Sequence, residues 1–259
     1  MTKNDQFISN LKEMDRVMRQ DIKDGHLWTY SNKSSRKGKG FYDTRSKGKY
    51  RINCVDGPQW ALRLSGKGIV SSNALSWYGG KGVGPVWLNG NAEKNARKYF
   101  DIFRYDGKYT LRQLINKHRI CSGDICVGFT SMSHTMVVLD LATGQGFDSG
   151  SGAYTVGHTG EDAVFKKWIG KQSCLGSRPI AIFRLKDRRH FIVQAGSYKT
   201  DLYKNFQKEL RDKFGVDSSI VDRNGEHLVA LGQYDDEYNA DFYKGEFLKR
   251  GIACQVREV

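Results

Sequence analysis

The chain has 259 residues, of which 39% are hydrophobic and 12% aromatic, and this composition excludes an intrinsically disordered protein. No apolar run approaches the roughly 20 residues that a membrane-spanning helix needs. The formal net charge of +14 is unevenly distributed, because residues 190–259 hold 10 Lys or Arg against 12 Asp or Glu. We therefore expect a soluble, globular protein without a transmembrane segment, whose basic charge lies in the first part of the chain.

The first 24 residues, Met1 to Asp24, place apolar side chains among charged ones at the spacing of an amphipathic helix. They contain neither the continuous apolar core nor the small-residue cleavage site of a secretory signal. We expect the protein to be made in the cytoplasm without a signal peptide. A role outside the cell would then require another route of release.

A strongly basic stretch follows between Ser31 and Arg51, where eight Lys or Arg residues face a single acid, Asp43. Such a field attracts any polyanion, whether nucleic acid, anionic lipid or a wall polymer such as teichoic acid. Charge alone does not identify the partner, and a solvated loop explains the stretch equally well.

Five cysteines make an odd count without any Cys-x-x-Cys spacing; they are Cys54, Cys121, Cys126, Cys174 and Cys254. Disulfide frameworks and zinc sites normally show paired spacings. We therefore expect no disulfide framework, no metal and no cofactor.

The last seventy residues repeat themselves at a shift of 36 positions. Each copy has the pattern strand, helix, strand. The expected strands are Phe191–Ser197, Ser218–Asp222, His227–Gln233 and Ala253–Arg257, and the expected helices are Thr200–Phe214 and Asp235–Arg250. Helix-ending glycines at 215 and 251 and a tight Asn-Gly turn at 224–225 agree with these bounds. The pattern predicts a four-stranded antiparallel sheet with two helices on one face, the split βαβ arrangement.

The repeat opens with Val193-Gln194-Ala195-Gly196-Ser197-Tyr198, which is echoed from Val229 to Tyr234. This motif resembles the SPOR domain, a peptidoglycan-binding module built from two βαβ copies. The resemblance implies that Tyr198 and Tyr234 contact the wall polymer; alternatively, both end strands and pack on the helices. RNA-binding modules of this fold carry a basic residue before Gly-Phe-Gly-Phe, which is absent here, so we expect no specific nucleic acid.

Cys54 follows the basic stretch and precedes Gln59 to Leu64, which has the pattern of a buried helix. The positive end of a helix and a nearby imidazolium both stabilise a thiolate, so this position suits a nucleophile. Because proline is tolerated only in the first helical turn, Pro58 predicts that the helix starts near Asp56 or Gly57, just after Cys54. The alternative is an inert core cysteine.

His134 stands at the start of an apolar strand that continues to Leu139. The next strand, Gly146 to Ser149, offers Asp148, whose carboxylate can accept a hydrogen bond from the far imidazole nitrogen and fix its tautomer. Asp140 and His158 are rival candidates for this third role, and His134 itself has a capping role as its alternative.

These segments resemble the NlpC/P60 superfamily of papain-like peptidoglycan hydrolases between about Tyr50 and Lys186. In that family a cysteine opens the core helix, a Gly-Asp-Ile/Val strand precedes a histidine-led strand, and a polar residue follows on the next strand. The resemblance implies that Cys54 is the nucleophile, His134 the base and Asp148 the orienting residue, with Gly123-Asp124-Ile125 as the preceding strand. The chain departs from the family at Asn53, at Val55-Asp56 and at Asp148, which leaves the cleaved bond open.

A glycine-rich, aromatic segment from Trp77 to Trp87 lies between the two catalytic segments. Aromatic rings on such a frame suit stacking on sugar rings or on a peptide stem. Together with Trp60 and the two tyrosines of the repeat, these rings give the candidate substrate-binding residues, which are Trp60, Trp77, Tyr78, Trp87, Tyr198 and Tyr234. The alternative is a surface loop that Trp87 anchors in the core.

The sequence as a whole predicts an α+β protein with a papain-like NlpC/P60 domain and its N-terminal helix at residues 1–188, and a SPOR-like βαββαβ domain at 189–259. The implied function is peptidoglycan hydrolysis by a cysteine endopeptidase or N-acetylmuramoyl-L-alanine amidase of the phage endolysin or autolysin type. Such an enzyme acts on the wall after holin-type release or lysis. The alternatives are a non-catalytic basic adaptor that binds wall polymers or nucleic acid, and a papain-like transglutaminase.

Overall fold

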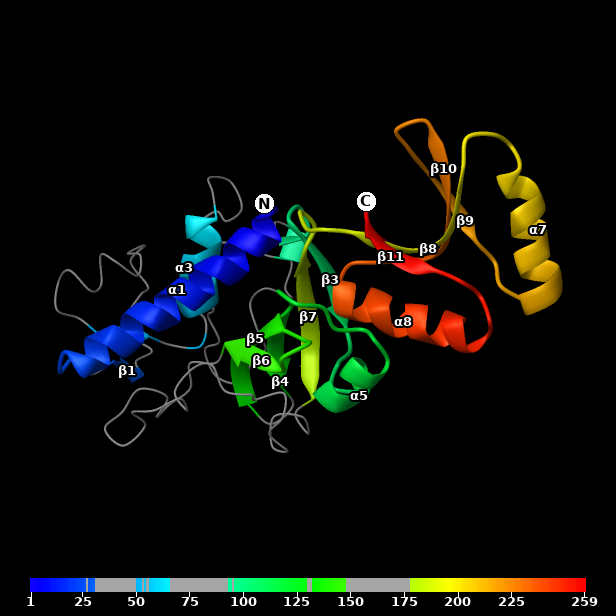
Figure 1. The fold of residues 1–259 in the computed structure, drawn as a ribbon. Helices are drawn as coiled ribbons and strands as arrows, with labels where there is room; N and C mark the ends of the chain where they lie inside the picture. The colour runs from blue at the N-terminus through cyan, green and yellow to red at the C-terminus, as the bar shows by residue number, and fades with distance from the viewer. Residues whose placement is uncertain are drawn as a thin grey trace. The chain divides into compact units, whose positions relative to one another are not determined.

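The computed structural model has an α+β architecture with two antiparallel sheets, as the sequence predicts (Figure 1). It describes residues 1–26, 28–30, 50–52, 54, 56–65, 93–94, 96–129, 132–147 and 178–259. The chain divides into two compact units, Met1–Asp187 and Arg188–Val259, with the boundary one residue before the expected one. Within the described ranges no helix is both long and apolar enough to cross a membrane.

The first unit is built on a five-stranded antiparallel sheet of order β3-β7-β4-β5-β6. A short parallel pair, β1 and β2, stands apart from it. The elements are α1 (Lys3–Lys23), β1 (Thr29–Tyr30), β2 (Arg51–Ile52), α3 (Asp56–Leu64), β3 (Phe100–Arg104), α5 (Leu111–Asn116), β4 (Ile125–Phe129), β5 (Met132–Asp140), β6 (Gln145–Phe147) and β7 (Pro179–Leu185).

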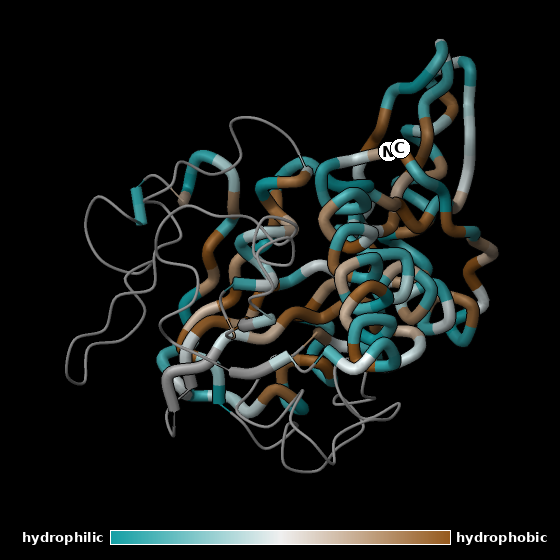
Figure 2. The backbone as a smooth tube through the Cα atoms, turned by 90° about the vertical axis from the view of Figure 1, so that its left-hand side faces the viewer, coloured by the Kyte–Doolittle hydropathy of each residue, from teal (hydrophilic) through white to brown (hydrophobic). Residues whose placement is uncertain are grey.

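Hydrophobic side chains cover both faces of this sheet. Alternate residues of β5 point to opposite faces: Val137 and Leu139 pack with α1 and α3, whereas Met136 and Val138 pack with α5. Figure 2 colours the backbone by hydropathy: the long hydrophobic stretches lie on extended segments, while the helices mix hydrophobic with hydrophilic residues. The sheet is therefore the middle layer of the first unit.

The N-terminal amphipathic helix forms as α1 and is part of this core. Thr2 caps it, because its hydroxyl accepts a hydrogen bond from the Asp5 N–H at 3.2 Å while the Asp5 carboxylate accepts one from the Thr2 N–H at 3.1 Å. Its apolar face is fully buried; the residues are Phe7, Leu11, Met14 and Met18. At its end, Trp28 Nε1 donates to the buried Asp21 carboxylate at 3.0 Å. The helix is thus a structural element of the first unit.

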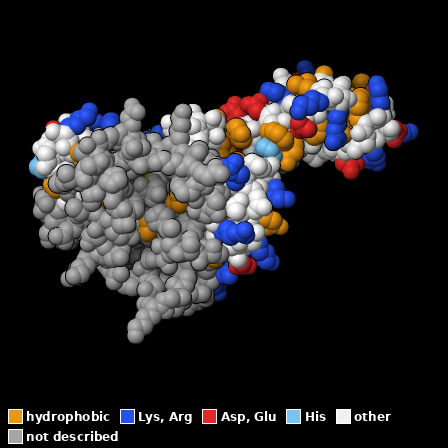
Figure 3. Space-filling model, turned by 90° about the horizontal axis from the view of Figure 1, so that it is seen from below, with side chains coloured by type: hydrophobic (Ala, Val, Ile, Leu, Met, Phe, Trp, Pro, Cys, Tyr) orange, Lys and Arg blue, Asp and Glu red, His pale blue; other side chains and the backbone are white. Residues whose placement is uncertain are grey.

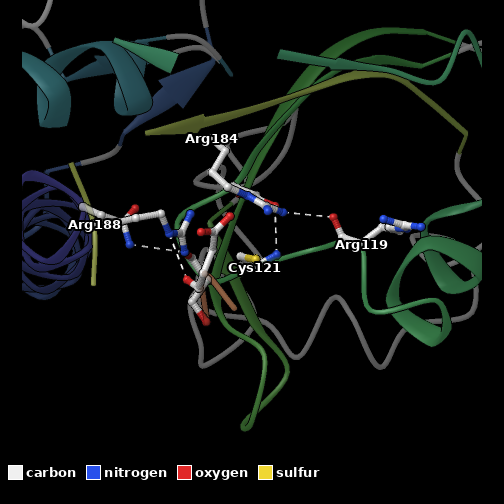
Figure 4. Close-up of polar contacts among 8 residues, drawn as sticks. Arg119, Cys121, Arg184 and Arg188 are labelled. Carbon is white, nitrogen blue, oxygen red and sulfur yellow. Dashed lines mark hydrogen bonds and ion pairs between the residues drawn. The ribbon is translucent and has the colours of Figure 1, made fainter. Parts of the chain in front are cut away.

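A buried ion pair joins β7 to the start of β4 (Figure 4). Arg184 donates from Nε to Asp124 Oδ1 at 2.9 Å and from Nη2 to Asp124 Oδ2 at 2.8 Å. The Arg184 side chain also donates to the Arg119 carbonyl at 3.0 Å, and the Cys121 N–H donates to Asp124 Oδ2 at 2.8 Å. Asp124 is 0% exposed, so the charge on its carboxylate is balanced entirely from within the chain.

The second unit has the strands and helices in the places that the repeat predicts. They are β8 (Phe191–Tyr198), α7 (Tyr203–Phe214), β9 (Ser219–Arg223), β10 (Glu226–Tyr234), α8 (Glu237–Lys249) and β11 (Gln255–Glu258). The sheet is antiparallel with order β11-β8-β10-β9. Asn224 and Gly225, with φ angles of 52° and 76°, form the tight turn between β9 and β10.

Both sheet faces of the second unit are apolar. The helix side contains Val193, Leu210 and Val229 in one cluster with many aromatic rings. The opposite side contains a smaller buried cluster without aromatic rings, formed by Ile192, Leu228 and Ala230. The Arg223 side chain of β9 also donates to the Glu258 carbonyl of β11, which links the two edge strands. The unit therefore has its own closed core.

Replacing Arg184 tests the buried ion pair. Arg184→Met keeps much of the packing but leaves Asp124 buried without its cation, so the free energy of unfolding of the first unit should fall by about 3–5 kcal/mol. Denaturant unfolding followed by tryptophan fluorescence measures this, because all five tryptophans precede residue 188.

Arg104→Met is the matched control, since Arg104 pairs with Glu93 near the surface. It should cost less than about 1 kcal/mol. Equal losses for Arg104→Met and Arg184→Met would contradict the importance given to the buried pair.

Candidate functional site

Cys54 lies in a turn immediately ahead of α3. The helix begins at Asp56, as the position of Pro58 predicts, so its positive end is next to Cys54. The Cys54 side chain is 5% exposed and belongs to the core layer that α1 and α3 share with the five-stranded sheet.

The first turn of α3 touches β6. A Cβ added to Gly57 would lie 2.6 Å from Cζ of Phe147, so only a glycine allows the helix to approach the ring this closely. Phe147 ends β6, and it pairs with Val137 of β5. The helix turn beside Cys54 is therefore packed on the strand that leads directly into position 148.

His134 lies on β5, three residues before Val137; its side chain is outside the described atoms. Asp148 and the rival His158 also lie outside the described residues, so their roles remain predictions. What the structure brings together is the Cys54 turn, the strand of His134 and the strand before Asp148.

Asp140, a rival candidate for the orienting residue, has a structural role instead. It lies at the end of β5, six residues beyond His134, which corresponds to about 20 Å along a strand. Its carboxylate accepts hydrogen bonds from the N–H groups of Ala142 at 2.9 Å and Thr143 at 3.2 Å. Asp140 therefore caps the turn between β5 and β6, which argues against a catalytic role.

The Gly123-Asp124-Ile125 segment has a structural basis that the sequence did not reveal. Gly123 has a φ angle of 88°, and an added Cβ would lie 2.7 Å from Cγ of Asn4 in α1. Its N–H donates to the Val138 carbonyl at 2.6 Å, and the Val138 N–H donates to the Asp124 carbonyl at 2.9 Å. Glycine thus permits the contact with α1, and Asp124 holds Arg184. A single arginine in the apolar strand Pro179–Leu185 was the available signal for this partner.

Trp60, predicted to contact substrate, is instead a core residue. It lies on α3, is 1% exposed and packs in the same layer as Cys54. A ring buried to this degree stabilises the helix position and offers no face to a ligand. Trp77, Tyr78 and Trp87 lie outside the described residues, and their proposed contacts remain predictions.

Burial does not distinguish Cys54 from Cys121, because the two side chains are 5% and 2% exposed, and the burial of Cys54 is what the alternative of an inert core cysteine predicts. Cys126 is completely enclosed, and burial raises the pKa of its thiol. Burial also raises the pKa of the Cys254 thiol in the second unit. In the described part of the chain, no cluster of three or more His, Cys, Asp or Glu residues could hold a metal ion.

Tyr198 and Tyr234 pack on the helices of the second unit, as the alternative interpretation predicts. Tyr198 lies 5.8 Å from Phe206, and Tyr234 stacks on Tyr243 at 5.0 Å, measured between ring centroids. The pKa of Tyr234 is raised to about 12, mainly because burial disfavours the charged phenolate. Both rings are partly buried in the helix-side cluster, so their first role is packing.

The repeated Gly-x-Tyr pattern has a steric explanation. A Cβ added to Gly196 would lie 2.8 Å from Cε2 of Tyr198, and one added to Gly232 would lie 2.8 Å from Cζ of Tyr234. Each tyrosine ring therefore lies over the glycine two residues before it. The motif that carried the resemblance to a wall-binding module is also a packing requirement of this sheet.

Gly232→Ala should accordingly lower the stability of the second unit by about 1–3 kcal/mol, because the tyrosine must leave its place. Gly245→Ala is the matched control: its added Cβ meets open space within α8, and it should raise stability by about 0.5–1 kcal/mol. Denaturation of residues 188–259, followed by circular dichroism, compares the two. If both alanines stabilise, the Tyr234 ring does not rest on Gly232.

No protein-family model and no curated protein matches the chain. Among solved structures, the chain is similar to the peptidoglycan-binding domain of the B. subtilis cell wall lytic enzyme CwlC, determined in solution. The identity is 20% and the TM-score 0.25, over 29% of this chain and 96% of that chain. At this TM-score the similarity carries no argument about the fold or the function of the chain.

Proposed function

We propose that the chain is a cysteine hydrolase of peptidoglycan in which Cys54 is the nucleophile, His134 the general base and Asp148 the residue that orients the imidazole. The observation that carries the proposal is the packing of the first α3 turn on Phe147. This contact brings the Cys54 turn onto Phe147 and, through the pair of Phe147 with Val137, beside β5. It positions the backbone of these elements, and the approach of the His134 and Asp148 side chains to Cys54 is part of the proposal.

In this proposal the start of α3 and strand β5 have separate roles. Cys54 immediately precedes α3, so the proposed nucleophile lies beside the start of a helix. In the proposed reaction, backbone N–H groups near Cys54 stabilise the oxyanion. A rigid β5, paired on both edges with β4 and β6, is a suitable support for the base.

The proposed reaction is acyl transfer to the thiolate. His134 takes the thiol proton, and Cys54 Sγ attacks an amide carbon of the peptidoglycan stem. The amine leaves with the proton from His134, and a water activated by His134 then hydrolyses the thioester. Asp148 holds the imidazole tautomer that accepts the first proton. The scissile bond joins either muramic acid to L-alanine or D-glutamate to the third stem residue, and mass spectrometry of the products separates these two cases.

For the second unit we propose wall binding. Its closed core and its separation from the first unit support an independent module. Its near-neutral charge, from 10 cations and 12 anions in residues 190–259, favours recognition by shape and hydrogen bonding over a general attraction to polyanions.

The nucleophile is tested by substitution. Cys54→Ala and His134→Ala should each lower the hydrolysis of soluble wall fragments by at least about 1,000-fold, because both act in the same step. Asp148→Asn should be milder, since a neutral amide retains part of the orientation. Mass spectrometry of the released amines measures the rates.

Cys254→Ala is the control for loss of a thiol and should leave the rate unchanged. Retention of a tenth of the wild-type rate by Cys54→Ala would reject Cys54 as the nucleophile. A larger loss in His158→Ala than in Asp148→Asn would transfer the orienting role to His158. Rapid product formation with an added amine in place of water would favour a transglutaminase.

The wall-binding role is tested by truncation after Asp187. The residues of the proposed chemistry all precede this point, so hydrolysis of soluble fragments should remain unchanged. Lysis of intact walls should fall several-fold through lost local concentration. Residues 188–259 alone should sediment with purified peptidoglycan; a folded fragment that ignores it, together with an inactive truncated chain, would make the second unit part of the catalytic scaffold.

A further inference from the structure

Several cations of the first unit lie close to an exposed tyrosine, Tyr109, either in sequence or through a backbone contact beside it. Residues 104–119 contain five Lys or Arg and one acid, Asp106. Arg178 joins them, because its Nη1 donates to the carbonyls of Gly107 at 3.3 Å and Lys108 at 3.2 Å. Lys and Arg side chains gather on the described surface in Figure 3, which is seen from the side where α5 lies in Figure 1. We define the Tyr109 patch as the exposed residues Lys108, Tyr109, Arg112, Lys117 and Arg178.

Two cations of the patch are held in place. The Lys117 ammonium lies over the Tyr109 ring, 5.8 Å from its centroid, and the two carbonyl contacts fix the Arg178 guanidinium. Cations that are already positioned lose less conformational freedom when an anion binds.

Tyr109 serves this patch as a support for cations. Its ring is 38% exposed, but it makes a T-shaped contact with Tyr105 at 6.1 Å and also carries Lys117. Proteins that bind single-stranded nucleic acid combine cations with open aromatic faces on which bases stack. Because Tyr105 and Lys117 both contact the Tyr109 ring, the patch is better suited to binding an anionic group than to stacking bases.

The chemistry of the cations favours phosphate. Arg178 presents a planar guanidinium group, which matches the paired oxygens of a phosphodiester. Several cations within one small area suit a polymer with a repeating charge better than a single anion.

We propose that the Tyr109 patch binds an anionic wall polymer whose repeating charge is a phosphodiester, the chemistry of teichoic acids. The inference rests on the proposed function and adds a second wall contact, on the unit that carries Cys54. It is a different part of the sequence from the basic stretch between Ser31 and Arg51, of which residues 31–49 lie outside the described residues.

The test uses the full chain with Cys54→Ala, so that walls are bound without being cut. Sedimentation measures its binding to purified walls before and after hydrofluoric acid removes the phosphodiester polymer. Lys117→Gln with Arg178→Gln should weaken binding to untreated walls about tenfold at low ionic strength, and the difference should vanish near 1 M salt, where charges are screened beyond about 3 Å.

The matched control is Lys12→Gln with Lys23→Gln, which removes the same charge from exposed sites on α1 of the same unit; it should bind untreated walls as the parent does. On stripped walls all three chains should bind alike. Equal binding of both double variants to untreated walls would overturn the proposal. An equal loss on stripped walls would assign the patch to peptidoglycan, and an equal or larger loss on single-stranded RNA would assign it to nucleic acid; either result overturns the proposal.

The proposed function is tested separately with Cys54 intact. The Lys117→Gln and Arg178→Gln chain should hydrolyse stripped walls at the rate of the control chain, because no phosphodiester remains to be bound. If neither chain hydrolyses them, the hydrolase proposal fails while the binding result stands. If only the patch variant is impaired, the patch contributes to the peptidoglycan site and the polymer proposal fails.

Discussion

The ion pair between Asp124 and Arg184 fixes the geometry on which the proposed site depends. A carboxylate at 0% exposure costs several kcal/mol in lost hydration unless its partners are well placed. Here two guanidinium hydrogen bonds and the Cys121 N–H satisfy it. The same residue is bonded through its carbonyl to Val138 of β5. The residue that carries the ion pair is therefore also bonded to β5 at Val138, four residues beyond His134.

Local patterns in the sequence were enough to predict much of the fold. The apolar spacing in α1, the proline near the start of α3 and the repeated strand and helix lengths of the second unit all act over a few residues, so they can be read directly. The order of strands in the first sheet could not be predicted in this way. β7 lies between β3 and β4, and the contact that explains its position joins residues 60 apart in sequence.

Aromatic residues were the least informative part of the candidate site. Trp60 was a candidate for substrate contact, but a helix that packs on a sheet buries the side that faces the core, and Trp60 is on that side. Tyr198 and Tyr234 show the same ambiguity in another form. The glycine two residues earlier makes room for the ring, so the pattern Gly-x-Tyr is required by packing whether or not a ligand binds there.

The uneven charge gives the two units different physical tasks within the proposed function. Electrostatic attraction from the first unit acts over about 10 Å at moderate ionic strength and weakens as salt rises. A near-neutral second unit relies on short-range contacts, which salt affects much less. When one unit is bound to the wall, the other unit is held near further binding sites on the same polymer, so its effective concentration there is raised, provided that the linker permits both contacts. Because the basic charge belongs to the unit with Cys54, electrostatic capture would retain the chemistry at the wall even while the second unit dissociates and rebinds.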